Sequence, residues 1–469
     1  MASDGGTSLA QYEKPRRDKG IRSYRIAMIS DFFHPSVGGV ENHIYMLAVG
    51  LFRRGHTVIV ITHHHPPDRI GIRYLLPGLK VYHLPLPTIS SSATLPNFML
   101  FLPYLRNILL RERIDLVHGH GSLSSMAHEG IMHAPMLGVR TVLTDHSLFG
   151  FGDAVGILTN KLLRAALRNV DGVICVSHTG RENTVLRADL DPIVTHVIPN
   201  AVVPSRFIPS PSSADPDYIT IVVISRLVYR KGVDLLVASA PHICRDFPEV
   251  RFVIGGDGPK MVELEQMREK HLLQDRIELI GHVKSRDVRS ILCKGQIFLN
   301  TSLTEAFGIA IIEAAATGLL VVSTRVGGVP EILPEDMICF AEPNEDDVVR
   351  ALSSAIHRIR AGAYDPFGAH DRVRKMYSWD EVAERTEHVY IGILEDTFIR
   401  STWDRMWRLL DTGKVFGWFM VIIFSVQHLF LYFLDWAFPR SEIDYVPEGT
   451  DWSLDRLYQM KKVEENTPE

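Results

Sequence analysis

An alternation of short apolar runs with helical stretches, repeated twice, restricts the fold of this chain more than any other feature. In the first half, residues 41–54 have the periodicity of an amphipathic helix, and apolar runs typical of buried strands occur at 25–30, 57–62, 114–118, 139–144, 172–176 and 194–198. Strands that alternate with helices usually pair in parallel. The first half is therefore predicted to form a doubly wound α/β sheet.

The alternation begins again after residues 204–217, which are rich in proline and serine and are predicted to be a linker. The later apolar runs lie at 219–224, 251–254, 277–280, 297–300 and 319–323, and helices are expected around 232–247, 259–272, 285–294, 308–317 and 345–361. We predict two Rossmann-like domains, at 24–203 and 218–378, after a flexible tail at 1–23 and before a helical segment at 379–414. Such domains bind ligands at the carboxyl ends of their strands, so a cleft between them is expected.

Residues 415–434 are twenty consecutive residues without a formal charge. As a helix they would span about 30 Å, the thickness of the hydrocarbon core of a bilayer, although a buried core helix remains an alternative. The basic residues Arg400, Arg405, Arg408 and Lys414 precede this segment, and only Arg440 follows closely. The positive-inside rule then predicts a transmembrane helix with the preceding residues in the cytosol and a lumenal tail at 435–469.

The composition excludes several classes of protein. The 469 residues carry 50 basic and 55 acidic side chains, so no overall positive charge draws the chain to nucleic acid. The four cysteines are far apart, which excludes a disulfide framework or a zinc ribbon and fits a reducing compartment. Residues 1–20 lack the apolar core of a signal peptide.

Two glutamates stand eight residues apart around a predicted strand–loop–helix junction in the second half. Glu305 lies in the loop and Glu313 in the helix that starts near Gly308. Free backbone N–H groups at Phe307, Gly308 and Ile309 would face a bound anion at this helix N-terminus. The two carboxylates suit the hydroxyl groups of a sugar and a ribose, but taken alone they also fit solvated residues beside a core helix.

Two further loops in the second half suit a diphosphate. Arg226 follows the strand at 219–224, and Lys231 comes five residues later, so that both cations can neutralise phosphate charge. Gly256 and Asp257 follow the next strand, where glycine permits close approach of a ligand. This loop lacks the full G-x-G-x-x-G order, which argues against a dinucleotide fingerprint. Ordinary surface charge and a plain turn are the alternatives.

The first half offers fewer candidate residues. Gly38 and Gly39 precede the helix at 41–54 and form either a phosphate cradle or a plain turn. His120 and His146 follow predicted strands and are expected to line a polar site. No essential metal is predicted, because two such histidines do not define a ligand geometry and neither D-x-D run follows a buried strand.

Residues 95–113 combine apolar bulk with arginines at the end. They suit either a segment at an anionic membrane surface or an amphipathic helix packed on its own domain.

In combination, these residues resemble the retaining GT-B glycosyltransferases, which use nucleotide sugars. The matching pieces, in the order of the family over about residues 25 to 335, are GGVE at 38–41, His120, Arg226 with Lys231, GGDGP at 255–259 and EAFGIAIIE at 305–313. Longer stretches, among them DFFHPSVGGVENHIYML, SRLVYRKG and VSTRVGGVPEILPE, are similar to the branch that starts glycosylphosphatidylinositol-anchor synthesis, over about residues 24 to 440.

The resemblance implies a specific reaction. The donor would be UDP-N-acetylglucosamine and the acceptor phosphatidylinositol, at the cytosolic face of the endoplasmic reticulum and together with other membrane subunits. Arg226, Lys231 and the helix start near Gly308 would stabilise the leaving diphosphate. Glu305 would orient the sugar, Glu313 would hold the ribose and His120 would face the reacting atoms. On the acceptor side, Arg73 and Lys80 would contact the inositol phosphate, and His146 would line the acceptor site.

The same residues fit two other functions. A lipid glycosyltransferase with another sugar donor, such as a mannosyltransferase, would use the same phosphate-binding parts. A non-catalytic scaffold subunit would keep the fold but predicts a damaged diphosphate site, whereas Arg226, Lys231, Glu305 and Glu313 are all present.

Overall fold

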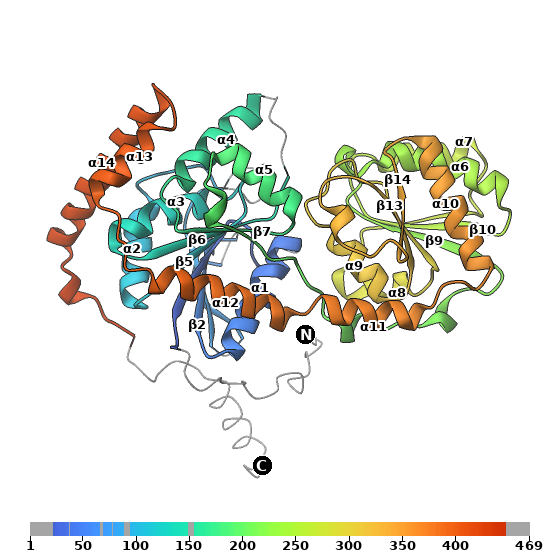
Figure 1. The fold of residues 1–469 in the computed structure, drawn as a ribbon, viewed down its shortest axis with the longest axis horizontal. Coiled ribbons are helices and arrows are strands. Elements are labelled where there is room, and N and C mark those ends of the chain that lie inside the picture. The colour runs from blue at the N-terminus through green and yellow to red at the C-terminus, as the bar shows by residue number, and fades with distance from the viewer. Residues whose placement is uncertain are drawn as a thin grey trace, which may run out of the picture. The chain divides into compact units, whose positions relative to one another are not determined.

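The computed structural model describes residues 22–36, 38–65, 69–76, 78–88, 94–148 and 154–446. The chain divides into two compact units. The first comprises residues 1–144, 154–173 and 383–469, and the second comprises residues 145–153 and 174–382. Each unit is built on one largely or wholly parallel sheet (Figure 1).

Within the described residues, the first sheet has eight strands in the order β3-β4-β2-β1-β5-β6-β7-β8. They are β1 (Arg25–Ile29), β2 (Thr57–His63), β3 (Gly71–Leu76), β4 (Leu79–Leu84), β5 (Leu116–His120), β6 (Arg140–Asp145), β7 (Gly172–Cys175) and β8 (Thr195–Val197). β1 pairs in parallel with β2 and β5, whereas β3 runs antiparallel to β4 at the sheet edge. The central strands are buried along nearly their whole length, as expected of a parallel sheet covered on both faces.

The helices that pack in the first unit come from both ends of the chain. They are α1 (Gly39–Arg53), α2 (Phe101–Arg111), α3 (Ser125–His133), α4 (Ala154–Leu167), α12 (Trp379–Glu395), α13 (Thr402–Leu410) and α14 (Phe416–Ala437). α12 begins in the second unit, and its residues from Ala383 onward belong to the first. The segment 383–446 therefore completes the first unit instead of forming a separate appendage.

Among the residues that the structure describes, the second sheet has six parallel strands in the order β11-β10-β9-β12-β13-β14. They are β9 (Ile219–Ile224), β10 (Val250–Gly255), β11 (Ile277–Gly281), β12 (Ile297–Asn300), β13 (Leu320–Thr324) and β14 (Ile338–Ala341). The helices of this unit are α5 (His178–Ala188), α6 (Val233–Asp246), α7 (Met261–Lys270), α8 (Val288–Leu292), α9 (Ile309–Ala316), α10 (Glu345–Arg360) and α11 (Pro366–Met376). Its core consists of aliphatic residues of these strands packed against α6 and α10.

The predicted doubly wound sheets are confirmed, with local differences. β3, β4 and β14 were not predicted, and the expected helix over 379–410 is interrupted between α12 and α13. The unit boundary falls at residue 174, whereas the sequence pattern places the linker at 204–217. The reason is that the start of α5 is bonded to the second unit: Glu331 accepts hydrogen bonds from the backbone N–H groups of His178 and Thr179, at 2.6 and 2.8 Å.

Residues 95–113 contain α2, which packs on its own unit. Phe101, Leu105 and Leu109 are buried in the first hydrophobic core, while Leu100 and Tyr104 are exposed. The helix is therefore packed on its own unit, as the second of the two expectations for this segment states, and its exposed residues are Tyr104, Asn107 and Arg111.

α14 is, among the described residues, the one helix that is long and apolar enough to cross a membrane. One of its faces packs on the first unit: Gln427 donates a 3.0 Å hydrogen bond to the carbonyl oxygen of Phe98, and Asp435 forms a 2.7 Å salt bridge with the buried Arg106. The other face is exposed and apolar. The segment predicted at 415–434 thus corresponds to α14, which extends three residues further.

A buried acid attaches α12 to the first unit. The Glu387 carboxylate accepts hydrogen bonds from Nε of Arg54 and from the ring of His56, both at 2.7 Å. Glu387 and the His56 side chain have no exposed surface. Burial lowers the pKa of His56, and the adjacent Glu387 opposes that shift.

Replacement of Glu387 by alanine should therefore destabilise the first unit by about 3 kcal/mol, because Arg54 and His56 would lose their buried partner. The measurement is the free energy of unfolding in urea. The exposed residue Glu384 lies on the same helix, and Glu384→Ala is the matched control. Equal stability of the two variants would contradict the role given to Glu387.

Candidate functional site

The predicted residues of the second half gather at one edge of the second sheet. β9 lies between β10 and β12, and all three strands run in parallel. Their carboxyl ends therefore deliver three loops to the same place. These loops carry Arg226 and Lys231 after β9, Gly256 and Asp257 after β10, and Glu305 after β12.

The loops after β9 and β10 are bonded to each other through their backbones. The N–H of Leu227 donates to the carbonyl oxygen of Asp257 at 2.9 Å, and the N–H of Lys260 donates to the carbonyl oxygen of Leu227 at 3.0 Å. Gly256 has φ +144°, and a Cβ on it would overlap with the carbonyl oxygen of Ser225. The glycine thus permits the close approach of the two loops. This is a structural reason for the motif, beside the ligand contact that the sequence also suggests.

Arg226 and Asp257 both have exposed side chains. Within the described residues, the Arg226 guanidinium makes no ion pair, whereas the Asp257 carboxylate accepts a 2.7 Å hydrogen bond from the N–H of Gly258. Arg226 is therefore available to a ligand, and Asp257 stabilises its own turn.

Lys231 and Glu305 form an ion pair between the loops after β9 and β12. Both side chains are about one-fifth exposed, 21% for Lys231 and 18% for Glu305, so solvent screens the pair only in part. Thr301 strengthens the same connection by donating a 3.0 Å hydrogen bond to the carbonyl oxygen of Lys231. The cation and the carboxylate that were predicted to act on the same ligand therefore lie in direct contact.

The N-terminus of α9 lies beside this ion pair. Gly308 caps the helix with φ +87°, in the left-handed region that glycine tolerates. Within the part of the chain that the structure describes, the N–H groups of Phe307, Gly308 and Ile309 donate no hydrogen bond. The Phe307 side chain is buried and contacts the ring of Tyr377, so only its backbone is available to a ligand.

The position of Glu305 depends on residues that the site prediction missed. The N–H of Gly328 donates to the carbonyl oxygen of Glu305 at 3.0 Å, and Ser177 donates to the carbonyl oxygen of Ala306 at 2.7 Å. Gly327, with φ +52°, lies so close to Glu305 that a Cβ would overlap with its carbonyl oxygen. The Gly–Gly pair after β13 was the available signal in the sequence.

Glu313 lies on α9 and is partly buried. Burial raises the pKa of Glu313 to about 7, and Arg206 opposes that shift. Near neutral pH the Glu313 carboxyl group is therefore partly ionised. The ionised form only accepts hydrogen bonds, whereas the protonated form also donates one. Both forms suit a hydroxyl group as partner.

In the first unit, Gly38 and Gly39 stand at the start of α1, as predicted. A Cβ on Gly38 would lie 2.5 Å from a carboxylate oxygen of Glu41, which occupies the first turn of the helix. The close approach of Glu41 is thus a structural reason for a glycine at this position, beside the predicted phosphate contact.

His120 ends β5 and is fully buried. Its ring lies 4.0 Å from that of His118 and 5.7 Å from that of His43, measured between ring centroids. The His118 ring is held in place by the fold, because its two ring nitrogens bond to the hydroxyl groups of Tyr390 and Thr144, at 2.6 and 2.7 Å. Burial holds the pKa of His118 well below its usual value, so it is a neutral ring.

The three candidate acceptor residues have different surroundings. Lys80 donates to both carboxylate oxygens of Glu112, at 2.9 and 3.1 Å, so it has a structural role beside the predicted lipid contact. Arg73 is exposed on β3 and donates to the carbonyl oxygen of Ile72. His146 follows Asp145, which accepts a 2.9 Å hydrogen bond from Thr184 of α5.

Replacement of Gly232 tests the loop architecture. Gly232 has φ +63°, and a Cβ on it would overlap with the carbonyl oxygen of Thr301. Gly362 has φ +62° and open space around it, so Gly362→Ala is a control for the backbone conformation alone. We expect a cost of about 1 kcal/mol for Gly362→Ala and at least about 3 kcal/mol for Gly232→Ala, measured as free energies of unfolding. Equal losses would contradict the tight contact.

The raised pKa of Glu313 predicts a pH-dependent stability. The folded chain keeps the Glu313 proton to higher pH than the unfolded chain, so the contribution of this group to stability is present below about pH 4.5 and is lost as the pH rises through about 7. Glu313→Gln removes this loss. Relative to the parent, the variant should gain about 2 to 3 kcal/mol between pH 5 and pH 8 in urea unfolding. A difference that does not change with pH would contradict the assignment.

Comparison with known families gives two matches. A family model described as PIGA (GPI anchor biosynthesis) matches residues 63–153, and one described as glycosyl transferases group 1 matches residues 205–360. The second match contains every donor-side residue discussed above from Arg226 to Glu313.

Curated relatives match nearly the whole chain. The phosphatidylinositol N-acetylglucosaminyltransferase gpi3 subunit of Schizosaccharomyces pombe is 51% identical over 422 residues, which cover 89% of this chain and 91% of the relative. A relative from Homo sapiens, also named as a subunit of phosphatidylinositol N-acetylglucosaminyltransferase, is 48% identical, with 92% of this chain and 88% of the relative covered.

Among solved structures, the sucrose-phosphate synthase of Thermosynechococcus elongatus has a TM-score of 0.64 at 21% identity and covers 79% of this chain and 99% of that protein. The shared architecture is the GT-B fold with two Rossmann-like domains, as the sequence predicts. This chain is a glycosyltransferase, and it belongs to the PIGA family, whose curated members are named as subunits of phosphatidylinositol N-acetylglucosaminyltransferase.

Proposed function

We propose that this chain transfers N-acetylglucosamine from UDP-N-acetylglucosamine to phosphatidylinositol with retention of configuration, the first step of glycosylphosphatidylinositol-anchor synthesis. The observation that carries the proposal is the joint position of Arg226, Lys231, Glu305 and the start of α9 at one sheet edge, in a chain whose relatives are named for this transfer.

The donor diphosphate would bind at this edge of the second sheet. Arg226 offers a forked guanidinium that makes no ion pair with any described residue, and the N–H groups at Gly308 and Ile309 point a helix N-terminus at the same ligand. As the glycosidic bond breaks, negative charge builds on the leaving UDP, and these fixed donors stabilise it without reorganisation.

The Lys231–Glu305 ion pair sets the position of both groups before the donor binds. Lys231 would share its charge between Glu305 and the diphosphate, and the remaining acceptor capacity of Glu305 would orient the sugar hydroxyls. Glu313 would hold the ribose. Gly38, Gly39 and His120 are proposed to act from the first unit, the glycines on the phosphate and His120 at the reacting face.

No side chain is assigned as a nucleophile in this proposal. Retention would follow from attack of the inositol hydroxyl on the face that UDP leaves, with a leaving phosphate oxygen taking the proton of that hydroxyl. Arg226, Lys231 and the α9 N-terminus supply the positive charge that a divalent metal supplies in other transferases. We therefore propose that the reaction needs no metal.

The lipid acceptor lies in a membrane, so the chain has to work at a membrane surface. We place the units on the cytosolic face of the endoplasmic reticulum membrane, with α14 as the membrane element, because the basic residues before α14 favour that side. A lumenal position of residues 435–469 requires the salt bridge between Asp435 and Arg106 to open in the membrane, since both residues belong to the first unit.

The relatives are named as subunits. We propose that this chain likewise works with other membrane subunits, and that the exposed apolar residues of α14 are available for contact with them or with lipid.

A transfer assay with the assembled enzyme tests the proposal. Radiolabelled UDP-N-acetylglucosamine should label phosphatidylinositol in the presence of EDTA, and other UDP- and GDP-sugars should not. Arg226→Ala should lower kcat/KM on the order of 100-fold, because a donor to the leaving diphosphate is lost. Glu305→Gln should also lower it strongly.

The matched control is Arg230→Ala, since Arg230 is exposed on the same turn and contributes its backbone carbonyl to the loop contact with Leu303. This variant should keep nearly full activity. Full activity of both Arg226→Ala and Glu305→Gln would refute the site. Transfer from a GDP-sugar would instead favour a lipid glycosyltransferase with another donor, and a complete lack of transfer would favour the scaffold reading.

A further inference from the structure

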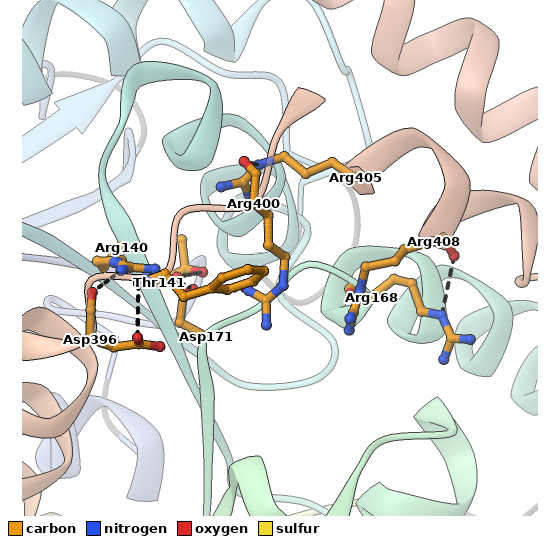
Figure 2. Close-up of polar contacts among 9 residues, drawn as sticks. Arg140, Thr141, Arg168, Asp171, Asp396, Arg400, Arg405 and Arg408 are labelled. Atoms are coloured by element: carbon orange, nitrogen blue, oxygen red, sulfur yellow. Dashed lines mark hydrogen bonds and ion pairs between the residues drawn. The ribbon is translucent and has the colours of Figure 1, made fainter. Parts of the chain in front are cut away.

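Five arginines of the first unit gather where α13 packs beside β6, β7 and the end of α4. They are Arg140, Arg168, Arg400, Arg405 and Arg408, and we call them the arginine cluster (Figure 2). The segments that carry them lie far apart in the sequence and none of them contributes to the donor site. The cluster therefore needs an explanation of its own.

One carboxylate holds the left part of the cluster in Figure 2. Asp171 accepts hydrogen bonds from Arg140 at 3.2 Å and from Arg400 at 3.1 Å, and also from the N–H of Thr141 at 2.9 Å. A single negative charge thus faces two guanidinium groups directly, and its acceptor capacity is already occupied.

The right part of the cluster is held by backbone groups. Nε of Arg408 donates to the carbonyl oxygen of Arg168 at 2.8 Å, and Nε of Arg168 donates to the carbonyl oxygen of Arg408 at 3.2 Å. Carbonyl oxygens satisfy hydrogen bonds but do not neutralise a full charge. Arg168 also reaches the exposed carboxylate of Asp411, at 3.1 Å.

Several guanidinium N–H groups of the arginine cluster donate no hydrogen bond to a described residue. The Arg405 residue is almost completely buried, and its Nη1 atom has no hydrogen-bond partner among the described residues. In the same part of the chain, only one nitrogen of Arg400 and one of Arg408 donate a hydrogen bond. Burial lowers the pKa of Arg408, and the neighbouring Arg400 and Arg168 lower it further.

The other nearby acids are engaged elsewhere. The Asp404 carboxylate caps α13 through Ser401, and the Asp396 carboxylate accepts the N–H of Phe398. A hollow of about 620 Å³ beside Arg140 is also lined by Asp115, Glu395 and Asp396, so it does not suit an anion. The unused cationic capacity therefore lies on the side of Arg400, Arg405 and Arg408.

α13 also carries an exposed apolar surface. Trp403 and Trp407 are one helical turn apart and are 69% and 65% exposed. α13 packs against α14, whose exposed residues are Trp418, Phe419, Ile422, Val426, Leu429, Tyr432, Phe433 and Trp436. Tryptophan beside arginine on a short amphipathic helix is typical of a membrane interface, where rings enter the headgroup layer and guanidinium groups meet phosphate.

We propose that the arginine cluster binds the phosphate of an anionic phospholipid headgroup while Trp403 and Trp407 enter the same leaflet. The bound phosphate accepts hydrogen bonds from Arg400 and Arg408 and lies in the field of Arg405. The site is separate from the donor site and from the glycosyl transfer itself, and it holds the first unit against an anionic membrane surface.

Energy transfer from tryptophan to a labelled lipid tests the proposal. The full chain is purified in dodecyl maltoside and titrated with phosphatidylserine or phosphatidylcholine that carry the same dansyl-labelled acyl chain. The parent should bind the anionic lipid more tightly than the zwitterionic one. The double variant Arg400→Gln, Arg408→Gln should weaken binding of the anionic lipid on the order of tenfold, to the level of phosphatidylcholine.

The matched control is the double variant Arg400→Lys, Arg408→Lys, which keeps both charges and should keep most of the preference. Because Arg400 also forms an ion pair with Asp171, the single variant Arg408→Gln is measured as well, since the Arg408 side chain is exposed and bonds only to a backbone carbonyl oxygen among the described residues. Binding of UDP to the second unit should be unchanged in all variants, which separates this test from that of the donor site.

The outcomes decide between the sources of phosphate. Displacement of the labelled lipid by inorganic phosphate at equal concentration would overturn the lipid assignment and favour a free anion. An unchanged preference for phosphatidylserine in both glutamine variants would show that the cluster serves only to attach α13 to α4 and β7, and would overturn the proposal.

Discussion

The position of β9 between β10 and β12 is the constraint on which the donor site depends. Three parallel strands that end at one edge bring together loops that are up to about 80 residues apart in the sequence. The loops then fix one another: the loops after β9 and β10 share backbone hydrogen bonds, and the Lys231–Glu305 pair connects the loops after β9 and β12. The glycines at 232, 256 and 308 make this spacing possible, because each adopts a backbone conformation that other residues avoid.

The first unit depends on contacts between the two ends of the chain. Glu387 of α12 satisfies Arg54 and His56, Tyr390 bonds to His118, and Asp435 of α14 meets the buried Arg106. Each contact joins residues more than 250 positions apart. The C-terminal helices therefore complete the fold of the N-terminal sheet, and the apolar helix α14 is attached to the same unit.

The sequence alone predicts much of this arrangement. Buried parallel strands have continuous apolar runs, so β9, β12 and most other strands were identified, and the motif residues after them were placed at strand ends. β3, whose residues are largely exposed, lacks such a run and was missed. The bond between Lys80 and Glu112 was not predicted, because the two residues lie 32 positions apart and no local pattern connects them.

The same limit applies to the residues that hold Glu305. Gly327, Gly328 and Ser177 act through backbone contacts across the second unit, and single-sequence periodicity carries no information on such pairs. The arginine cluster is a further example. Arg140, Arg168 and Arg400 are each ordinary basic residues in the sequence, and only the packing of α13 beside β7 turns them into a concentration of charge.

The most direct test of the donor site is an experimental density map of the full chain with UDP bound. The account predicts that the β-phosphate lies within hydrogen-bond distance of the Arg226 guanidinium and the N–H of Gly308, with Lys231 beside it and the ribose hydroxyls at Glu313. Nucleotide density at another edge of the second sheet, with those side chains turned away from it, would contradict the account.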